Sequence, residues 1–412
     1  MSDLFWPGDE RAGTLVTELA LLEAMEAVES AWLAALVSTG LAPETARHPV
    51  HQLVSAADID ALARGAESAG NPVLGLVTLL RERLGDTDAA RWLHRGLTSQ
   101  DVLDTALVLT LRDVLDELSR QLRHQVDLLT SLVRAHRDSR QIGRTLTQHA
   151  VPITFGLKAS AWLTGVLDSA ARVAAVRSAQ TVQLGGAAGT LAASVELARL
   201  RSDREPTAVA WQLVRATADS LGLAPGLPWQ TTRGPVTSVG DALVTCTDAW
   251  GHVAADVSTL CRPEIAELAE GRGGGSSTMP GKRNPTLSIL IRRAALSGPP
   301  LAATLHLAAA TTVDERSDGA WHAEWATLRD LARRTVVAGR QTTELLSELR
   351  VDADRMRATL DPVGVPGEQQ SMAELAGGVP DGSYLGATAS MIDTVLERAE
   401  AFHSGAPVGV TS

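Results

Sequence analysis

The chain has 412 residues, of which 45% are hydrophobic and 21% charged, and its formal net charge is -11. This composition is ordinary for a globular protein and excludes a disordered or collagen-like chain. The negative balance argues against nucleic-acid binding, which needs a basic face. No apolar run reaches the roughly 18 residues of a membrane helix, and the N-terminus, MSDLFWPGDERAG, has no secretory pattern. We therefore expect a cytoplasmic protein without membrane contact.

Cysteine use is sparse, with Cys246 and Cys261 alone. Two thiols are too few for a disulfide framework or for a zinc site built from thiolates. We expect both to be buried apolar residues, and we expect no metal.

Apolar residues recur every three or four residues along two long segments, from Val114 to Val133 and from Val239 to Leu260. This is the pattern of helices with one buried stripe. Alternation with a period of two is nearly absent, and Tyr and Phe are scarce. The sequence therefore predicts an all-α fold built around a bundle of long helices.

Three regions of the chain differ in the length of their apolar segments and in their content of Pro and Gly. Residues 1–108 contain short apolar segments broken by prolines, which predicts a small N-terminal helical domain. Residues 109–348 contain the long periodic segments and predict the central bundle. Residues 349–412 are rich in Pro and Gly before a final helical segment, so we expect a short C-terminal helical cap.

A glycine-rich loop at residues 273–285, GGGSSTMPGKRNP, interrupts the central region. It is not a Walker loop, because Ser276 replaces the first glycine and Arg283 follows Gly281-Lys282. It is not a dinucleotide loop either, because Ser276 again replaces glycine and residues 262–270 read as helix. We therefore expect no cofactor. Ser276, Lys282 and Asn284 together suit proton transfer beside a carboxylate, where an enediolate forms.

Two further polar segments interrupt the helices. The first, HRGLTSQDVLDT at 94–105, crowds His94, Thr98 and Ser99 before a long helix. It either binds an anion at the helix start or simply caps the helix. The second, GRTLTQHAVP at 143–152, contains Arg144, Gln148 and His149.

Arg144 suits bidentate binding of a carboxylate, whereas His149 taken alone is more typical of a structural histidine. Farther along, His322 looks like part of a packed helix. Asp314, Glu315 and Glu324 suit exposed charge at a helix end better than an acid–base pair.

These motifs together resemble the fumarase/aspartase superfamily. GSSTMPGKRNP at 275–285 resembles its signature loop, and HRGLTSQDVLDTA and GRTLTQHAVPITFGLKA resemble its other two active-site segments. Four stretches resemble the 3-carboxy-cis,cis-muconate cycloisomerases within it, so the resemblance covers nearly the whole chain. They are TSQD at 98–101, VQLGGAAGTLAA at 182–193, AWHAEW and YLGATASMID at 384–393.

The resemblance implies a cofactor-free homotetramer with a shared helical core and active sites assembled from three subunits. It implies a small tricarboxylate substrate, 3-carboxy-cis,cis-muconate, whose internal carboxylate adds to a double bond to give 4-carboxymuconolactone in the protocatechuate branch of the β-ketoadipate pathway.

The resemblance also implies roles for individual residues. Ser276 matches the loop serine that acts as the base in eliminations, and Lys282 and Asn284 match residues that bind the carboxylate and stabilise the enediolate. Positions His94, Thr98, Ser99, Arg144 and Gln148 are expected to bind substrate. His149, with Lys282, is a candidate proton donor.

Two positions depart from the family patterns. Leu146 replaces a histidine of the eliminating lyases, which favours the cycloisomerases, whereas Gly281 stands where cycloisomerases commonly carry histidine. The C-terminal region is also shorter than the usual third domain. The alternative enzyme is a fumarate-releasing C–N lyase, adenylosuccinate-lyase-like or acting on a substituted succinate. A non-catalytic structural protein on the same scaffold, like the crystallin relatives, is disfavoured by the intact loop.

Overall fold

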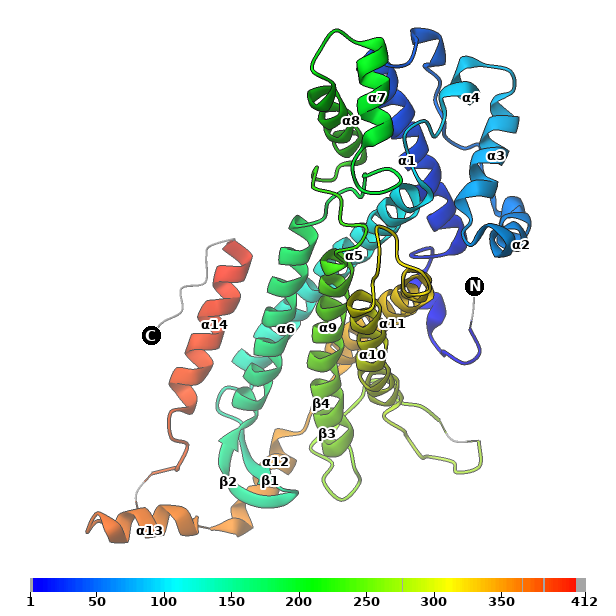
Figure 1. Ribbon diagram of the computed structural model, residues 1–412. Helices are drawn as coiled ribbons and strands as arrows, with labels where there is room; N and C mark the ends of the chain where they lie inside the picture. The colour runs from blue at the N-terminus through cyan, green and yellow to red at the C-terminus, as the bar shows by residue number, and fades with distance from the viewer. Residues whose placement is uncertain (1–2, 276, 365, 381, 405–412) are drawn as a thin grey trace.

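The computed structural model describes residues 3–275, 277–364, 366–380 and 382–404. Its long axis is set by five long helices that pack against one another in the middle of the molecule (Figure 1). These are α5 (Ser99–Ala135), α6 (Phe155–Ser178), α9 (Gly234–Leu260), α10 (Thr286–Ala310) and α11 (Ala320–Glu348). The helical bundle predicted from the sequence is confirmed.

The two predicted stripes form the centre of this bundle. In α5 the side chains of Val114, Leu118 and Leu122 are fully buried, and in α9 the same holds for Leu243, Trp250, Val253 and Val257. Cys246 lies in the α9 stripe and is buried, whereas Cys261 is only half-buried. A helix with one apolar face must bury that face against its neighbours, which explains why these long helices pack side by side.

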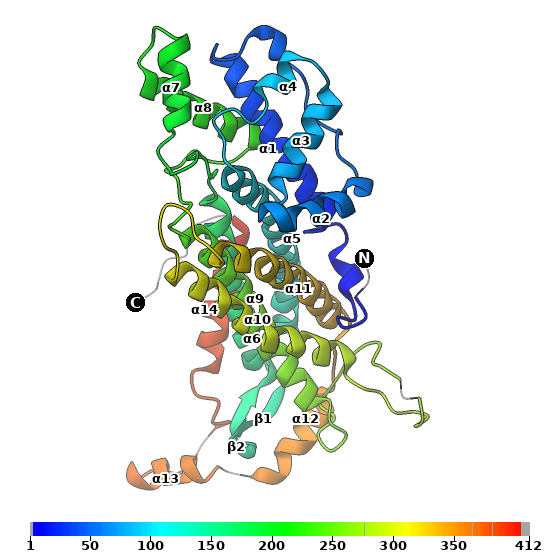
Figure 2. The same ribbon diagram turned by 45° about the vertical axis from the view of Figure 1, so that its right-hand side comes forward.

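Shorter helices cover the end of the bundle where α5 begins (Figures 1 and 2). They comprise α1 (Glu18–Ser38), α2 (Ile59–Ala69), α3 (Val73–Leu84), α4 (Asp88–Trp92), α7 (Ala192–Arg201) and α8 (Pro206–Leu221). Short 3-10 turns lie at Asp9–Ala12, Glu44–Ala46, Ala56–Asp58 and Asp361–Val363. The helix α1 packs against both α5 and α8, so segments far apart in the chain meet at this end.

A β-hairpin at the opposite end departs from the purely helical expectation. Strand β1 (Arg140–Thr145) pairs antiparallel with β2 (Gln148–Thr154), with an irregularity at Gly143. A second, minimal pair joins β3 (Leu268–Ala269) to β4 (Arg350–Val351). The helix expected over residues 262–270 is also wrong, because α9 ends at Leu260 and turns lead into β3.

The C-terminal part contains α12 (Ala353–Leu360), α13 (Gly367–Leu375) and α14 (Thr388–Ser404). Helix α14 packs along α6, whereas α13 projects from the body in both views (Figures 1 and 2). The three-part division stays a prediction: its first division lies inside the continuous α5, and its second follows the last residue of α11. Within the described ranges, no helix is long and apolar enough to cross a membrane.

Candidate functional site

The start of α5 gathers several predicted substrate-binding residues. Thr98 is the N-cap of α5, and its backbone N–H donates to Asp101 Oδ2 over 3.0 Å. The hydroxyl of Thr98 accepts a hydrogen bond from the guanidinium of Arg316, a residue that the sequence interpretation did not single out. The positive end of the helix dipole and Arg316 both favour an anion here. Capping and anion binding are therefore compatible at this helix start.

His94 lies just before α5 and is held by a carboxylate. Its Nδ1 is 2.5 Å from Oε1 of Glu29 in α1, and the Glu29 side chain is fully buried. His94 has a left-handed backbone with φ of 63°. We call His94, Thr98, Ser99 and Arg316 the α5 N-terminal cluster.

Asp101 is a buried carboxylate that fixes the glycine-rich stretch after α6. It accepts hydrogen bonds from the backbone N–H groups of Gly185 and Gly186 over 2.8 and 2.9 Å, and from the Gln183 side chain over 3.3 Å. Burial raises the pKa of Asp101 to about 7, although these hydrogen bonds oppose the shift. The aspartate of the TSQD motif is the sole sequence feature that points to this role.

A buried ion cluster joins the starts of α5, α9 and α11. Arg233 donates to Asp104 over 2.7 and 3.1 Å and to Glu324 over 2.6 to 3.1 Å. Trp321 Nε1 adds a hydrogen bond of 2.9 Å to Asp104. Burial raises the pKa of Glu324, and Arg233 partly offsets this. The expectation that Glu324 is exposed charge at a helix end is therefore wrong.

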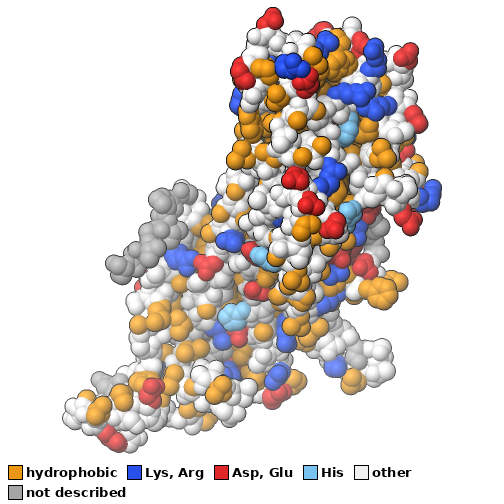
Figure 3. Space-filling view, viewed as in Figure 1, with side chains coloured by type: hydrophobic (Ala, Val, Ile, Leu, Met, Phe, Trp, Pro, Cys, Tyr) orange, Lys and Arg blue, Asp and Glu red, His pale blue; other side chains and the backbone are white. Residues whose placement is uncertain are grey.

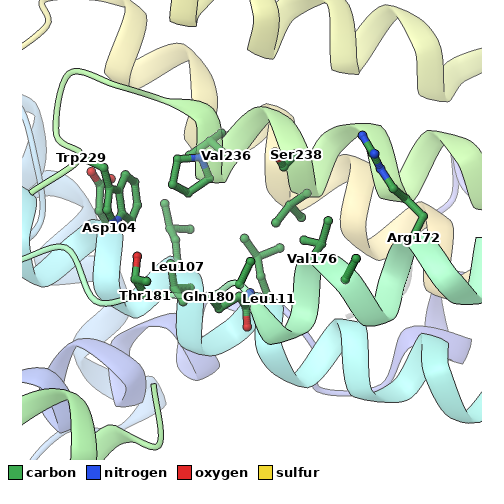
Figure 4. Close-up of a pocket in the computed structure, with 15 residues that line it drawn as sticks. Asp104, Leu107, Leu111, Arg172, Val176, Gln180, Thr181, Trp229, Val236 and Ser238 are labelled. Atoms are coloured by element: carbon green, nitrogen blue, oxygen red, sulfur yellow. The ribbon is translucent and has the colours of Figure 1, made fainter. Parts of the chain in front are cut away.

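A pocket of about 330 Å³ lies beside this ion cluster, between α5, α6 and α9 (Figure 4). Asp104 and Trp229 stand at one end and Arg172 at the other, with apolar side chains such as Leu107 and Val176 between them. The carboxylate of Asp104 is already bound by Arg233. The described lining includes none of the predicted site residues, so this pocket is not the predicted active site.

The β-hairpin carries the second predicted segment. Arg144 forms a forked ion pair with the fully buried Glu267, over 2.6 and 3.0 Å. A guanidinium already bound by a carboxylate of its own chain is poorly suited to clamp a substrate, which argues against the predicted role of Arg144. Gln148 and His149 are exposed.

The hairpin tip is unusual in its backbone. Leu146 and Thr147 have φ of 47° and 70°, a conformation that costs energy for side chains other than glycine. The Leu146 side chain is 96% exposed. The hairpin therefore exposes the apolar side chain of Leu146 and the polar side chains of Gln148 and His149.

A larger pocket, of about 820 Å³, lies at the base of this hairpin. Arg144 and His149 line it together with Lys158, Arg262 and Arg355. Lys158 is 3.4 Å from the carboxylate of Asp256. Asp256 and Glu264 also line this pocket, and Arg144 and Lys158 are already paired with carboxylates, so its basic charge is largely balanced.

The signature loop joins β3 to α10 and is anchored at its base. Gly274 and Asn284 exchange two backbone hydrogen bonds of 2.7 and 2.8 Å, and Asn284 Nδ2 donates to the carbonyl of Gly275 over 3.3 Å. Lys282 is exposed. Ser276, the predicted base, lies outside the described residues. Gly281 has φ of 84° with open space around it, so glycine meets a backbone requirement there.

The three segments do not meet within one chain. The α5 N-terminal cluster and the hairpin lie at opposite ends of α5, whose 37 residues span about 55 Å at 1.5 Å per residue. The signature loop projects away from the body in both views (Figures 1 and 2). A site that uses all three segments needs more than one copy of the chain.

The groups that would hold a cofactor or metal are few. Among the described residues, no group of three or more His, Cys, Asp and Glu side chains is placed to hold a metal ion.

Acidic and basic side chains are interspersed over the face shown in Figure 3, together with hydrophobic ones.

Comparisons with known proteins agree with the motif pattern. Residues 21–297 match the family model described as lyase. The chain is 44% identical over 367 residues to nitrosuccinate lyase of Streptomyces davaonensis, covering 86% of this chain and 76% of that protein. It is 38% identical over 349 residues to 3-carboxy-cis,cis-muconate cycloisomerase of Bradyrhizobium diazoefficiens, covering 82% and 74%.

Among solved structures, the 3-carboxy-cis,cis-muconate lactonizing enzyme of Pseudomonas putida matches with a TM-score of 0.77 at 32% identity. The match covers 94% of this chain and 84% of that one. The chain therefore belongs to the lyase family of the fumarase/aspartase superfamily.

Proposed function

We propose that this enzyme is a C–N lyase that eliminates nitrite from nitrosuccinate and releases fumarate. The observation that carries the proposal is the 44% identity to nitrosuccinate lyase over 86% of the chain, against 38% to a cycloisomerase over 82%. Gly281 supports it, because cycloisomerases commonly carry histidine at this position. The proposal moves the assignment from the predicted cycloisomerase to its C–N lyase alternative.

The reaction uses the same chemistry that the loop motif predicts. A base removes a proton from the central carbon that does not carry the nitro group, and the bonding electrons move into the carboxylate on that carbon as an enediolate. The double bond then forms while the C–N bond breaks, and nitrite leaves with the electron pair. Ser276 is the candidate base, and Lys282 and Asn284 are the candidates that stabilise the enediolate.

The two candidate substrates share a pattern of groups. Nitrosuccinate has two carboxylates and a nitro group, and 3-carboxy-cis,cis-muconate has three carboxylates. A nitro group is planar with two oxygens, as a carboxylate is, so both substrates present three such groups. The N-terminus of α5, Arg316 and Lys282 are donors that suit them.

We also propose that the enzyme is a homotetramer with shared active sites. The three motif segments lie apart in one chain, and α10 leaves an apolar stripe uncovered. The stripe consists of Ile289, Leu296, Pro299, Ala303 and Leu307, which lie along one face and are all exposed, with the exposed Arg292 between the first two. A long exposed apolar face on a central helix is typical of a helix that packs against another copy.

The cycloisomerase activity is the second candidate. It is supported by the 38% identity to the cycloisomerase of B. diazoefficiens and by Leu146, which replaces the histidine of the eliminating lyases. Addition of a carboxylate to a double bond passes through the same enediolate, so the loop residues serve both reactions.

A substrate comparison tests both proposals. Purified enzyme is incubated with nitrosuccinate, and nitrite is measured by colorimetry and fumarate by ultraviolet absorbance. In parallel, 3-carboxy-cis,cis-muconate is followed by loss of its diene absorbance. We expect nitrite and fumarate in equal amounts, and release of both at least about 100-fold slower from the Lys282→Ala variant. Diene loss without nitrite release, at high enzyme concentration, would overturn the first proposal in favour of the second.

A further inference from the structure

A carboxylate–histidine pair lies at the α5 N-terminal cluster. Glu29 Oε1 is 2.5 Å from Nδ1 of His94, and the Glu29 side chain is fully buried. Its other oxygen, Oε2, has no hydrogen-bond partner among the described residues. A buried carboxylate with so few partners lowers the stability of the fold. A well-packed apolar residue at this position would give a more stable protein. Its contact with His94 therefore points to a task other than stability.

The loop around His94 is clamped on both sides. Trp32 Nε1 donates to the carbonyl of Arg95 over 2.7 Å, and Arg81 donates to the carbonyl of Leu93 over 2.8 Å. Arg81, in α3, also interacts electrostatically with Glu29, and burial lowers its pKa, helped by the like charge of Arg95. These contacts hold the backbone on both sides of His94, while Glu29 holds its ring.

An ionised carboxylate accepts hydrogen bonds and donates none. Glu29 therefore requires a proton on Nδ1 of His94 and turns Nε2 to the opposite side of the ring. Nε2 has no hydrogen bond with described residues, and the His94 side chain keeps 20% of its surface exposed. His94 comes four residues before Thr98, the N-cap of α5, whose hydroxyl is bound by Arg316.

We propose that Glu29 is a positioning residue that fixes the tautomer and orientation of His94, so that Nε2 contacts a carboxylate or nitro group of the substrate. The proposal rests on the lyase function proposed above. Glu29 acts through His94 and does not itself contact the substrate. Its role is that of a buried acceptor which orients an imidazole.

The test compares Glu29→Gln with a matched control, Glu26→Gln. Glu26 is a second buried carboxylate in α1, but it accepts from the backbone N–H groups of Gln52 and Leu53, over 3.0 and 2.6 Å. A glutamine at position 29 can donate as well as accept, so it permits the other tautomer of His94. We expect Glu29→Gln to lower kcat/KM for nitrosuccinate by about 10- to 100-fold and to change its pH profile. Glu26→Gln should keep the wild-type profile.

A spectroscopic arm separates this proposal from the function itself. Nitrogen-15 spectra of histidine-labelled protein report which ring nitrogen carries the proton, and His94→Gln identifies the His94 signals. We expect a hydrogen-bonded Nδ1 proton in the wild type and in Glu26→Gln, and its loss or redistribution in Glu29→Gln. A His94 tautomer that is unchanged in Glu29→Gln would overturn the positioning role, even if the wild type proves inactive on nitrosuccinate. Wild-type kcat/KM and pH profile in Glu29→Gln would overturn it as well.

Discussion

At the scale of single residues, Lys282 carries the clearest expectation about chemistry. Its ammonium is exposed on the signature loop and suits a developing enediolate. We expect Lys282→Ala to lower kcat by about 100-fold or more, because a charge aimed at the transition state is lost. Arg283→Ala removes the neighbouring charge of the same loop and should have a much smaller effect. Steady-state kinetics checks this, and equal losses in the two variants would contradict a specific role for Lys282.

Asp101 gives a prediction about pH. Burial raises its pKa from 3.8 to about 7, so between these values the folded protein keeps a proton that the unfolded chain has lost. The contribution of Asp101 to the free energy of unfolding therefore falls as the pH rises through this window and is constant outside it.

The Asp101→Asn variant cannot ionise, so it isolates this contribution. We expect the free energy of unfolding of the wild type, minus that of the variant, to fall between pH 4 and pH 7 by at most about 4 kcal/mol. Urea unfolding at several pH values measures it. A difference that stays constant, or that grows with pH, would mean that the buried Asp101 is ionised throughout.

At the scale of elements, the ion cluster joins the starts of three helices of the bundle. Arg233→Met would leave the Asp104 and Glu324 carboxylates buried without a counterion, and we expect a loss of about 3–5 kcal/mol in the free energy of unfolding. Arg177→Met removes a surface pair of 2.7 Å with Asp116 and should cost at most about 1 kcal/mol. Denaturant unfolding compares the two variants, and similar small losses would show that the cluster is replaceable.

The elements differ in how far the sequence predicts them. The stripes of α5 and α9 are local and periodic, so Leu118 and Leu243 reveal their helices and their buried faces directly. The hairpin escapes this reasoning, because Gly143 disturbs the pairing and its turn uses Leu146 and Thr147 where glycine or asparagine would be the usual signal.

Contacts between distant segments are harder still. Glu324 pairs with Arg233, 91 residues away, and the Glu29–His94 contact spans 65 residues. A carboxylate on a helix is expected to be solvated unless its partner is known, so the sequence alone predicts neither the burial of Glu324 nor the contact of Glu29. The motifs themselves are local, so Thr98, Lys282 and Gln148 can be proposed from the sequence, whereas their distances from one another cannot.

At the scale of the whole molecule, the separation of the motif segments has a consequence that mixing experiments can measure. Lys282→Ala removes a predicted site residue from the signature loop, and Gln148→Ala removes one from the hairpin. Each variant should be nearly inactive alone. If a site draws these segments from different chains, some sites of a mixed tetramer receive two intact segments. Random assembly of equal amounts should restore about a quarter of wild-type activity.

The matched control places both lesions in one segment. Lys282→Ala mixed with Asn284→Ala should restore nothing, because every signature loop then carries a defect. Coexpression allows the chains to mix during assembly, and size-exclusion chromatography with light scattering verifies the oligomer. Recovery in the first mixture alone supports shared sites. No recovery in either mixture, from intact tetramers, would mean that loop and hairpin serve one site from the same chain, despite the projection of the loop away from the body.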